Sequence, residues 1–228
     1  MEPGAVPSEP LQRFRSVVAG DPAAVRLDLA TLALTEVLSG AVDAPAALGR
    51  LDSMATGVDD FAGLCQRVFD TEGFRGACPP TAEPALSFLD RVLERRRGLP
   101  ILMGVVLIEV GRRAGVPVLA INLPLHFVVA DGRAEGVFVD PCTGRAMSPD
   151  EVRVFLDQWS GGRVAWSDRH LRAVPARHVV IRILTNLQSV YQRRRDPVRL
   201  ALVAAMRASI PELAQEQPLA VRLGAVFN

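Results

Sequence analysis

Apolar residues in the first third of the chain recur every three or four positions, the spacing of helices that bury one face. The pattern predicts three successive helices. The first is opened by Asp21 and stopped by Gly40, the second is opened by Asp43, and the third runs from about Val58 to Thr71. Three amphipathic helices in succession predict a helical N-terminal lobe.

A fourth helix, marked by the apolar residues between Leu86 and Leu93, is expected to end at Gly98. The helix after it is apolar on nearly every side from Ile101 to Ile108, which indicates a buried helix. Pro100 begins it, and Gly115 follows its last turn as a C-terminal cap. Gly104 and Gly111 each cost roughly 1 kcal/mol in a helix interior. Their presence indicates that another element packs closely against this helix.

Two apolar runs with strand character follow, at 123–130 and 137–141, joined by the polar link 131–135. A link of this length is ordinary for a hairpin, and its glycine suits a turn. The sequence therefore predicts an antiparallel hairpin at the centre of a small sheet.

The hairpin brings a histidine and an aspartate together. If Ala130 pairs with Gly136, His126 falls opposite Asp140 on the same face, with Cβ atoms roughly 4.5–5.5 Å apart. An imidazole oriented by a carboxylate is half of a nucleophilic triad.

The last third returns to helical spacing. A capping box at Ser148 predicts a helix, 163–166 is expected to be a short strand, and the apolar stripe of 179–191 predicts a long helix. Asp196 caps its partner helix, and prolines at 211 and 218 are expected to start short final helices.

Composition narrows the class of protein. Of 228 residues, 49% are hydrophobic, so a sizeable core is possible, and the net charge of +1 argues against a general nucleic-acid binder. No apolar run reaches about 18 residues, and the N-terminus has no signal-peptide pattern, so no membrane span and no secretion are expected. No cofactor motif appears, and the three cysteines suit neither a disulfide framework nor a metal site. A reducing cytoplasm is the expected location.

The order of buried helix, strand, His126, strand and Asp140 resembles the core of the transglutaminase-like (papain-like) superfamily. The closer resemblance is to its bacterial SirB-type branch, a transglutaminase-like core with tetratricopeptide-like C-terminal helices. The motifs that carry it are Ser87-Phe88-Leu89, Val92 to Ile101, Arg113 to Pro117, Leu123 to Phe127, and Val139-Asp140-Pro141.

The resemblance implies an α+β fold with a papain/transglutaminase-like core, a small antiparallel sheet, a helical N-terminal lobe and C-terminal helical hairpins. We expect a flexible N-terminus over 1–20, the lobe and core over 21–174, and tetratricopeptide-like helices over 175–228. The chain departs from the branch at Leu125, where glycine is usual, and at Cys142, where an aromatic residue is usual.

The superfamily places a catalytic cysteine at the start of the buried helix, where this chain has Pro100 or Ile101. No Ser, Thr or Cys lies between Ser87 and Cys142. The preferred hypothesis is therefore a binding or accessory protein whose cleft holds a peptide, a protein or a small molecule.

The alternative is an enzyme of acyl-transfer, amide-hydrolysis or general-base type that uses His126 and Asp140. Cys142 is the one nearby candidate nucleophile in sequence, although it lacks the helix terminus that activates a thiol. A purely structural role for the His126–Asp140 pair also stays open, since a buried histidine commonly hydrogen-bonds to a carboxylate. Glu94 and Glu109 are expected to pair with arginine.

Overall fold

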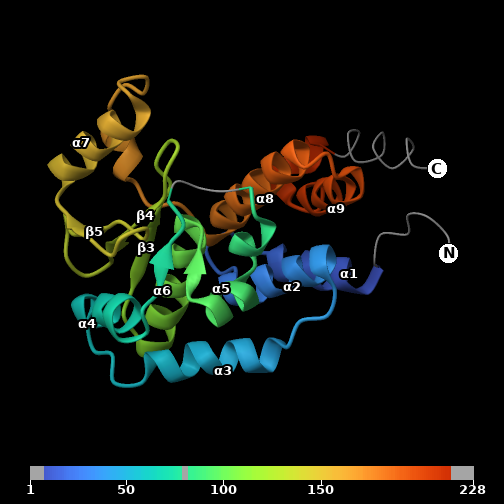
Figure 1. The fold of residues 1–228 in the computed structure, drawn as a ribbon, viewed down its shortest axis with the longest axis horizontal. Helices are drawn as coiled ribbons and strands as arrows, with labels where there is room; N and C mark the ends of the chain where they lie inside the picture. The colour runs from blue at the N-terminus through green and yellow to red at the C-terminus, as the bar shows by residue number, and fades with distance from the viewer. Residues whose placement is uncertain (1–7, 79–81, 217–228) are drawn as a thin grey trace.

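The computed structural model describes residues 8–78 and 82–216. The buried helix α6 (Pro100–Ala114) runs through the middle of the molecule, with a small sheet on one side and helices on the other (Figure 1). The sheet is antiparallel with the order β3-β4-β5-β6. Its strands are β3 (Val118–Ile121), β4 (Val128–Asp131), β5 (Phe138–Val139) and β6 (Ala146–Met147). The α+β architecture expected from the sequence is confirmed.

The N-terminal lobe is helical, as predicted. It consists of α1 (Ser8–Val18), α2 (Leu27–Ser39), α3 (Ala44–Ala55), α4 (Phe61–Cys65) and the π-helix η1 (Gln66–Thr71). The side chain of Asp43 accepts a hydrogen bond from the Ala46 N–H at 3.0 Å and caps α3 as expected.

The described part of the chain begins with a helix. Residues 1–7 lie outside the described part, but 8–18 form α1, which buries Leu11, Phe14 and Val18. These three residues make a stripe with helical spacing that the neighbouring Pro and Gly residues obscure in the sequence. The sequence analysis did not predict the helix α1, and the flexible segment expected over 1–20 stays a prediction.

The predicted cap of α2 was also wrong. The helix begins at Leu27, not at Asp21, and it is the Glu109 carboxylate that accepts from the Leu27 N–H at 2.9 Å and the Asp28 N–H at 3.3 Å. Glu109 lies on α6, so the start of α2 is set by a contact between segments far apart in sequence.

Close packing on α6 explains its glycines, as predicted. A Cβ atom on Gly104 would collide with the Phe127 ring, and one on Gly111 would lie 2.7 Å from the Val116 carbonyl oxygen. Phe127 comes from the segment that leads into β4, so glycine at position 104 lets the sheet approach the helix.

Two short segments connect the lobe to α6. β1 (Arg75–Gly76) pairs in parallel with β2 (Arg97–Gly98), and between them lie η2 (Pro84–Ser87) and α5 (Leu89–Arg95). Two-residue strands leave no hydrophobic periodicity, and neither was predicted.

The hairpin has a register shifted by two residues from the expected one. Ala130 pairs with Phe138 and Val129 with Val139, because β4 continues to Asp131 and the loop runs from 132 to 137. A shift of two preserves the face to which each side chain points. The predicted pairing of Ala130 with Gly136 was wrong, but His126 and Asp140 stay on one face.

The C-terminal helices are α7 (Pro149–Ser160), α8 (Ala176–Arg193) and α9 (Pro197–Arg207), followed by the 3-10 helix η4 (Pro211–Glu216). Both the Ser148 capping box and the Asp196 cap are present as predicted. The strand expected over 163–166 is absent, and the 3-10 helix η3 (Asp168–Leu171) follows instead. The helix predicted at Pro218 lies outside the described residues.

Candidate functional site

His126 and Asp140 meet at the sheet, as the sequence predicts. His126 lies just before β4 and Asp140 just after β5, and His126 Nε2 is 2.9 Å from Asp140 Oδ1. Both residues are buried.

Hydrogen bonds hold Asp140 in its ionised form. Burial alone would raise the pKa of this carboxyl, but hydrogen bonds from His126, the Cys142 N–H and the Thr143 hydroxyl outweigh it, so the pKa lies below its usual range. An ionised carboxylate only accepts hydrogen bonds, so Nε2 of His126 carries the proton. In the neutral imidazole Nδ1 is then an acceptor.

Two aromatic rings of α7 cover the histidine. The ring centroids of Phe155 and Trp159 lie 4.8 Å and 5.2 Å from that of His126. The two rings stack on each other at 5.8 Å. Packing against them fixes the plane of the imidazole, while Asp140 fixes its rotation.

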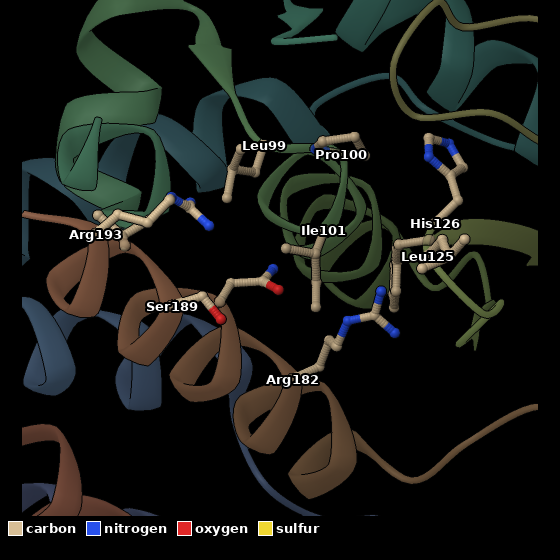
Figure 2. Close-up of a pocket in the computed structure, with 11 residues that line it drawn as sticks. Leu99, Pro100, Ile101, Leu125, His126, Arg182, Ser189 and Arg193 are labelled. Carbon is tan, nitrogen blue, oxygen red and sulfur yellow. The ribbon is translucent and has the colours of Figure 1, made fainter. Parts of the chain in front are cut away.

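His126 lines a cavity of about 250 Å³ between the start of α6, the segment before β4 and one face of α8 (Figure 2). Its apolar lining is Leu99, Pro100, Ile101, Leu125, Phe127 and Val190, and its polar lining is His126, Arg182, Asn186, Ser189 and Arg193. We call this cavity the α6–α8 pocket.

The α6–α8 pocket lies where the superfamily resemblance places the catalytic cysteine. Leu99, Pro100 and Ile101, at the start of α6, present only hydrocarbon there. Among the described residues that line the pocket, Ser189 alone carries a hydroxyl, and it donates to the Thr185 carbonyl at 3.1 Å rather than to His126. The histidine therefore has no nucleophile to activate in this arrangement.

The polar wall of the pocket was missed in the sequence. Arg182, Asn186, Ser189 and Arg193 recur along α8 at intervals of four, three and four, so they form one stripe of the helix. The same periodicity that predicted the buried stripe of 179–191 could have grouped them. It could not have shown that this stripe faces α6.

Cys142 does not stand as a free thiol. It forms a disulfide with Cys78, with the two Cα atoms 6.4 Å apart. A disulfide sulfur is not a thiolate, so the predicted nucleophile at position 142 is unavailable in this state. The sequence analysis predicted no disulfide framework and did not foresee this one bond. Burial raises the pKa of the remaining thiol, Cys65, to about 12, so it stays protonated at neutral pH.

Glu94 and Glu109 have the predicted partners. Glu94 pairs with Arg91 at 3.3 Å. Glu109 pairs with Arg112 and Arg113, both at 2.9 Å. Neither glutamate lines the α6–α8 pocket.

Within residues 8–78 and 82–216, no group of three or more His, Cys, Asp or Glu side chains is arranged to hold a metal ion. No helix in that part of the chain is both long and apolar enough to cross a membrane.

A buried helix packed on a small antiparallel sheet, with a histidine and an aspartate on neighbouring strand ends beside the helix start, defines a papain-like class of fold. The sequence profile of the transglutaminase-like superfamily matches residues 34–185. The chain belongs to this superfamily.

Curated relatives extend the comparison. A UPF0162 protein of Xylella fastidiosa is 35% identical over 167 residues, covering 71% of this chain and 58% of the relative. A UPF0162 protein of Pseudomonas aeruginosa is 26% identical over 148 residues, covering 65% and 54% respectively. The chain thus spans little more than half the length of these relatives. No solved structure matches it.

Proposed function

We propose that this chain is a transglutaminase-like domain that binds a ligand in the α6–α8 pocket and does not carry out thiol-dependent acyl transfer. The observation that carries the proposal is the start of α6, where Pro100 and Ile101 occupy the nucleophile position and line the pocket. The disulfide of Cys142 supports it, because this cysteine, the other candidate nucleophile, has no free thiol.

In this function His126 acts as a fixed hydrogen-bonding group. Asp140 holds the proton on Nε2, and the rings of Phe155 and Trp159 hold the imidazole plane. Nδ1 makes no hydrogen bond to any described residue, so its lone pair is unused. In this function a ligand that reaches the ring, whose side chain is 2% exposed, supplies the missing donor. A peptide end, a segment of a protein or a small molecule are the ligand types that such a pocket suits.

The test compares turnover with binding. The reduced protein is assayed with activated acyl esters and with an amine acceptor, beside His126→Ala and, as a matched control, the exposed His178→Ala. We expect all three proteins to give the same background rate. In parallel, small-molecule fragments are screened by amide NMR, and those that bind are expected to perturb Ile101, His126 and Val190 together.

Turnover that disappears in both His126→Ala and Cys142→Ser would overturn the proposal in favour of a thiol enzyme. If the fragments bind elsewhere on the protein, the proposal that the α6–α8 pocket binds a ligand is wrong.

One observation favours a second function. His126 lines the pocket, Asp140 holds the proton on Nε2, and Nδ1 keeps the unshared lone pair that a general base needs. Under this alternative, ester hydrolysis is lost in His126→Ala but retained in Cys142→Ser.

We also assign the chain to the SirB-type branch and interpret α8 and α9 as a tetratricopeptide-like hairpin. The support is the pair of helices joined by a turn that Asp196 caps. The domain boundaries and the cytoplasmic location stay predictions. Persistent disulfides are typical of oxidising compartments, so the Cys78–Cys142 bond weighs against the predicted location.

A further inference from the structure

The charged groups of the α6–α8 pocket share one sign. Arg182 and Arg193 line it from α8, and no aspartate or glutamate is found among its described lining residues. The carboxylate that pairs with His126, Asp140, does not line the pocket.

Arg182 is half-buried and lacks a carboxylate partner within ion-pair distance among the described residues. Its Nη1 donates to Asn122 Oδ1 at 2.7 Å and to the Leu123 carbonyl at 3.3 Å. Its Nε and Nη2 donate to no residue in the described part of the chain. Burial lowers the pKa of Arg182, with no opposing contribution from a nearby acid. A desolvated cation of this kind gains stability when an anion reaches it.

Figure 2 shows the guanidinium of Arg182 reaching from α8 toward Ile101 and Leu125, at the start of α6 and before β4. α6 is 15 residues long, and the N–H of Ile101 has no acceptor among the described residues. The partial positive charge of this helix end therefore adds to that of Arg182.

We propose that the α6–α8 pocket binds the oxyanion of a small molecule, a carboxylate or a phosphate, with the Arg182 guanidinium as its main contact. This inference deepens the proposed binding function and rests on it. The cavity of about 250 Å³ is below the usual range of roughly 300–1,000 Å³ for drug-sized ligands, so it suits a small metabolite.

Arg193 takes a lesser part. It lies eleven residues beyond Arg182 on α8, about 16 Å along the helix axis, and it is exposed. Its charge attracts the anion and holds the outer end of the ligand, while Arg182 binds the inner end.

The experiment uses three probes: succinate for carboxylates, inorganic phosphate for phosphates, and neutral succinamide as the uncharged match of succinate. Binding to the full chain is followed at constant ionic strength through the Nε–H signals of ¹⁵N-labelled arginine. We expect saturable shifts of the Arg182 signal with succinate or phosphate, and none with succinamide. The anion that binds more tightly shows whether the natural ligand carries a carboxylate or a phosphate.

Variants separate a specific site from general attraction. Arg182→Gln is expected to weaken binding about tenfold or more, and Arg182→Lys, which keeps the charge but loses the planar fork, to weaken it less. Arg193→Gln is expected to weaken binding about threefold. The matched control is Arg194→Gln, because Arg194 is the exposed C-cap residue of α8 and does not line the pocket. It is expected to bind as the parent does.

Three outcomes would overturn the inference: no saturable binding of either anion, unchanged binding in Arg182→Gln with an intact amide spectrum, or equal weakening in Arg194→Gln. If neutral fragments occupy the pocket while both anions fail, the oxyanion inference is wrong and the proposed binding function stands. If no fragment and no anion binds there, both fail.

Discussion

Buried charge is arranged in opposite ways in two regions of this molecule. Beneath the start of α2, the buried Asp28 and Glu109 are paired: Arg113 donates to Asp28 at 2.6 Å and to Glu109 at 2.9 Å. Burial would raise the pKa of Asp28, but hydrogen bonds from Arg26 and Arg113 outweigh it and lower the pKa. At the α6–α8 pocket, burial lowers the pKa of Arg182, and no nearby carboxylate opposes this shift.

The difference separates structural charge from charge available to a ligand. A balanced cluster gains nothing from a further ion, whereas an unbalanced one does. By this criterion the α2–α6 cluster holds helices together; its three carboxylates and three arginines are Asp28, Asp52, Glu109, Arg26, Arg112 and Arg113. The α6–α8 pocket retains binding capacity. The following predictions test this contrast.

The largest effect is expected from Arg113→Met. It removes the central cation of Asp28 and Glu109 and leaves them only the more exposed Arg26 and Arg112. The expected cost is therefore at most about 3–5 kcal/mol, the cost of a buried pair that loses its partner completely. Arg182→Met, the matched change in the pocket, is expected to alter the free energy of unfolding by less than about 1 kcal/mol, since no ion pair is broken. Urea unfolding measures both. Similar losses in the two variants would contradict the contrast.

An intermediate effect is expected from Asp140→Asn, which removes charge-assisted hydrogen bonds and should cost about 2 kcal/mol at pH 7. The pKa of Asp140 is lower folded than unfolded, so as pH falls the unfolded state binds the proton first. The stabilisation is therefore complete above the unfolded pKa of about 4 and is lost as pH falls through the folded pKa.

The measurement is the free energy of unfolding from pH 7 to pH 3. Asp140→Asn should fall less steeply over the acid range than the parent, and the exposed Asp59→Asn should follow the parent. Parallel curves for the parent and Asp140→Asn would rule out this role.

The smallest effect is expected from Leu125→Gly. Leu125 has a φ of 64°, a left-handed conformation that costs non-glycine residues about 1–2 kcal/mol, and its side chain is 56% exposed at the pocket. Glycine is expected to stabilise the fold by up to about 1 kcal/mol and to weaken ligand binding by widening the pocket. Arg195→Gly, at a φ of 54° outside the pocket, should stabilise similarly without affecting binding. A thermal melt with and without succinate compares them; a destabilised Leu125→Gly would refute the argument.

Local signals made much of the fold predictable. The caps at Asp43, Ser148 and Asp196, and the glycines of α6, act through neighbouring residues or through one close contact, so sequence spacing reveals them. The sequence also showed that Leu125 stands where the SirB-type branch usually has glycine. Glycine at such a position suggests a left-handed backbone.

The remaining features depend on contacts between distant segments. Glu109 caps α2 from 82 residues away, and Cys78 reaches Cys142 across 64 residues. The polar stripe of α8 becomes a pocket wall only because the helix lies beside the start of α6. Of the candidate site, the sequence could predict the His126–Asp140 pair but not the arginine that faces it.

The two faces of the helix α8 make different contacts. One face supplies Arg182 to the pocket, and the other buries Ile183, Leu187 and Tyr191 in the core, where α8 packs against α9. The pocket wall and the α8–α9 hairpin therefore share one rigid helix. By thermodynamic reciprocity, any partner that shifts this hairpin changes the affinity of the pocket for its ligand, and the ligand changes the affinity for that partner by the same factor.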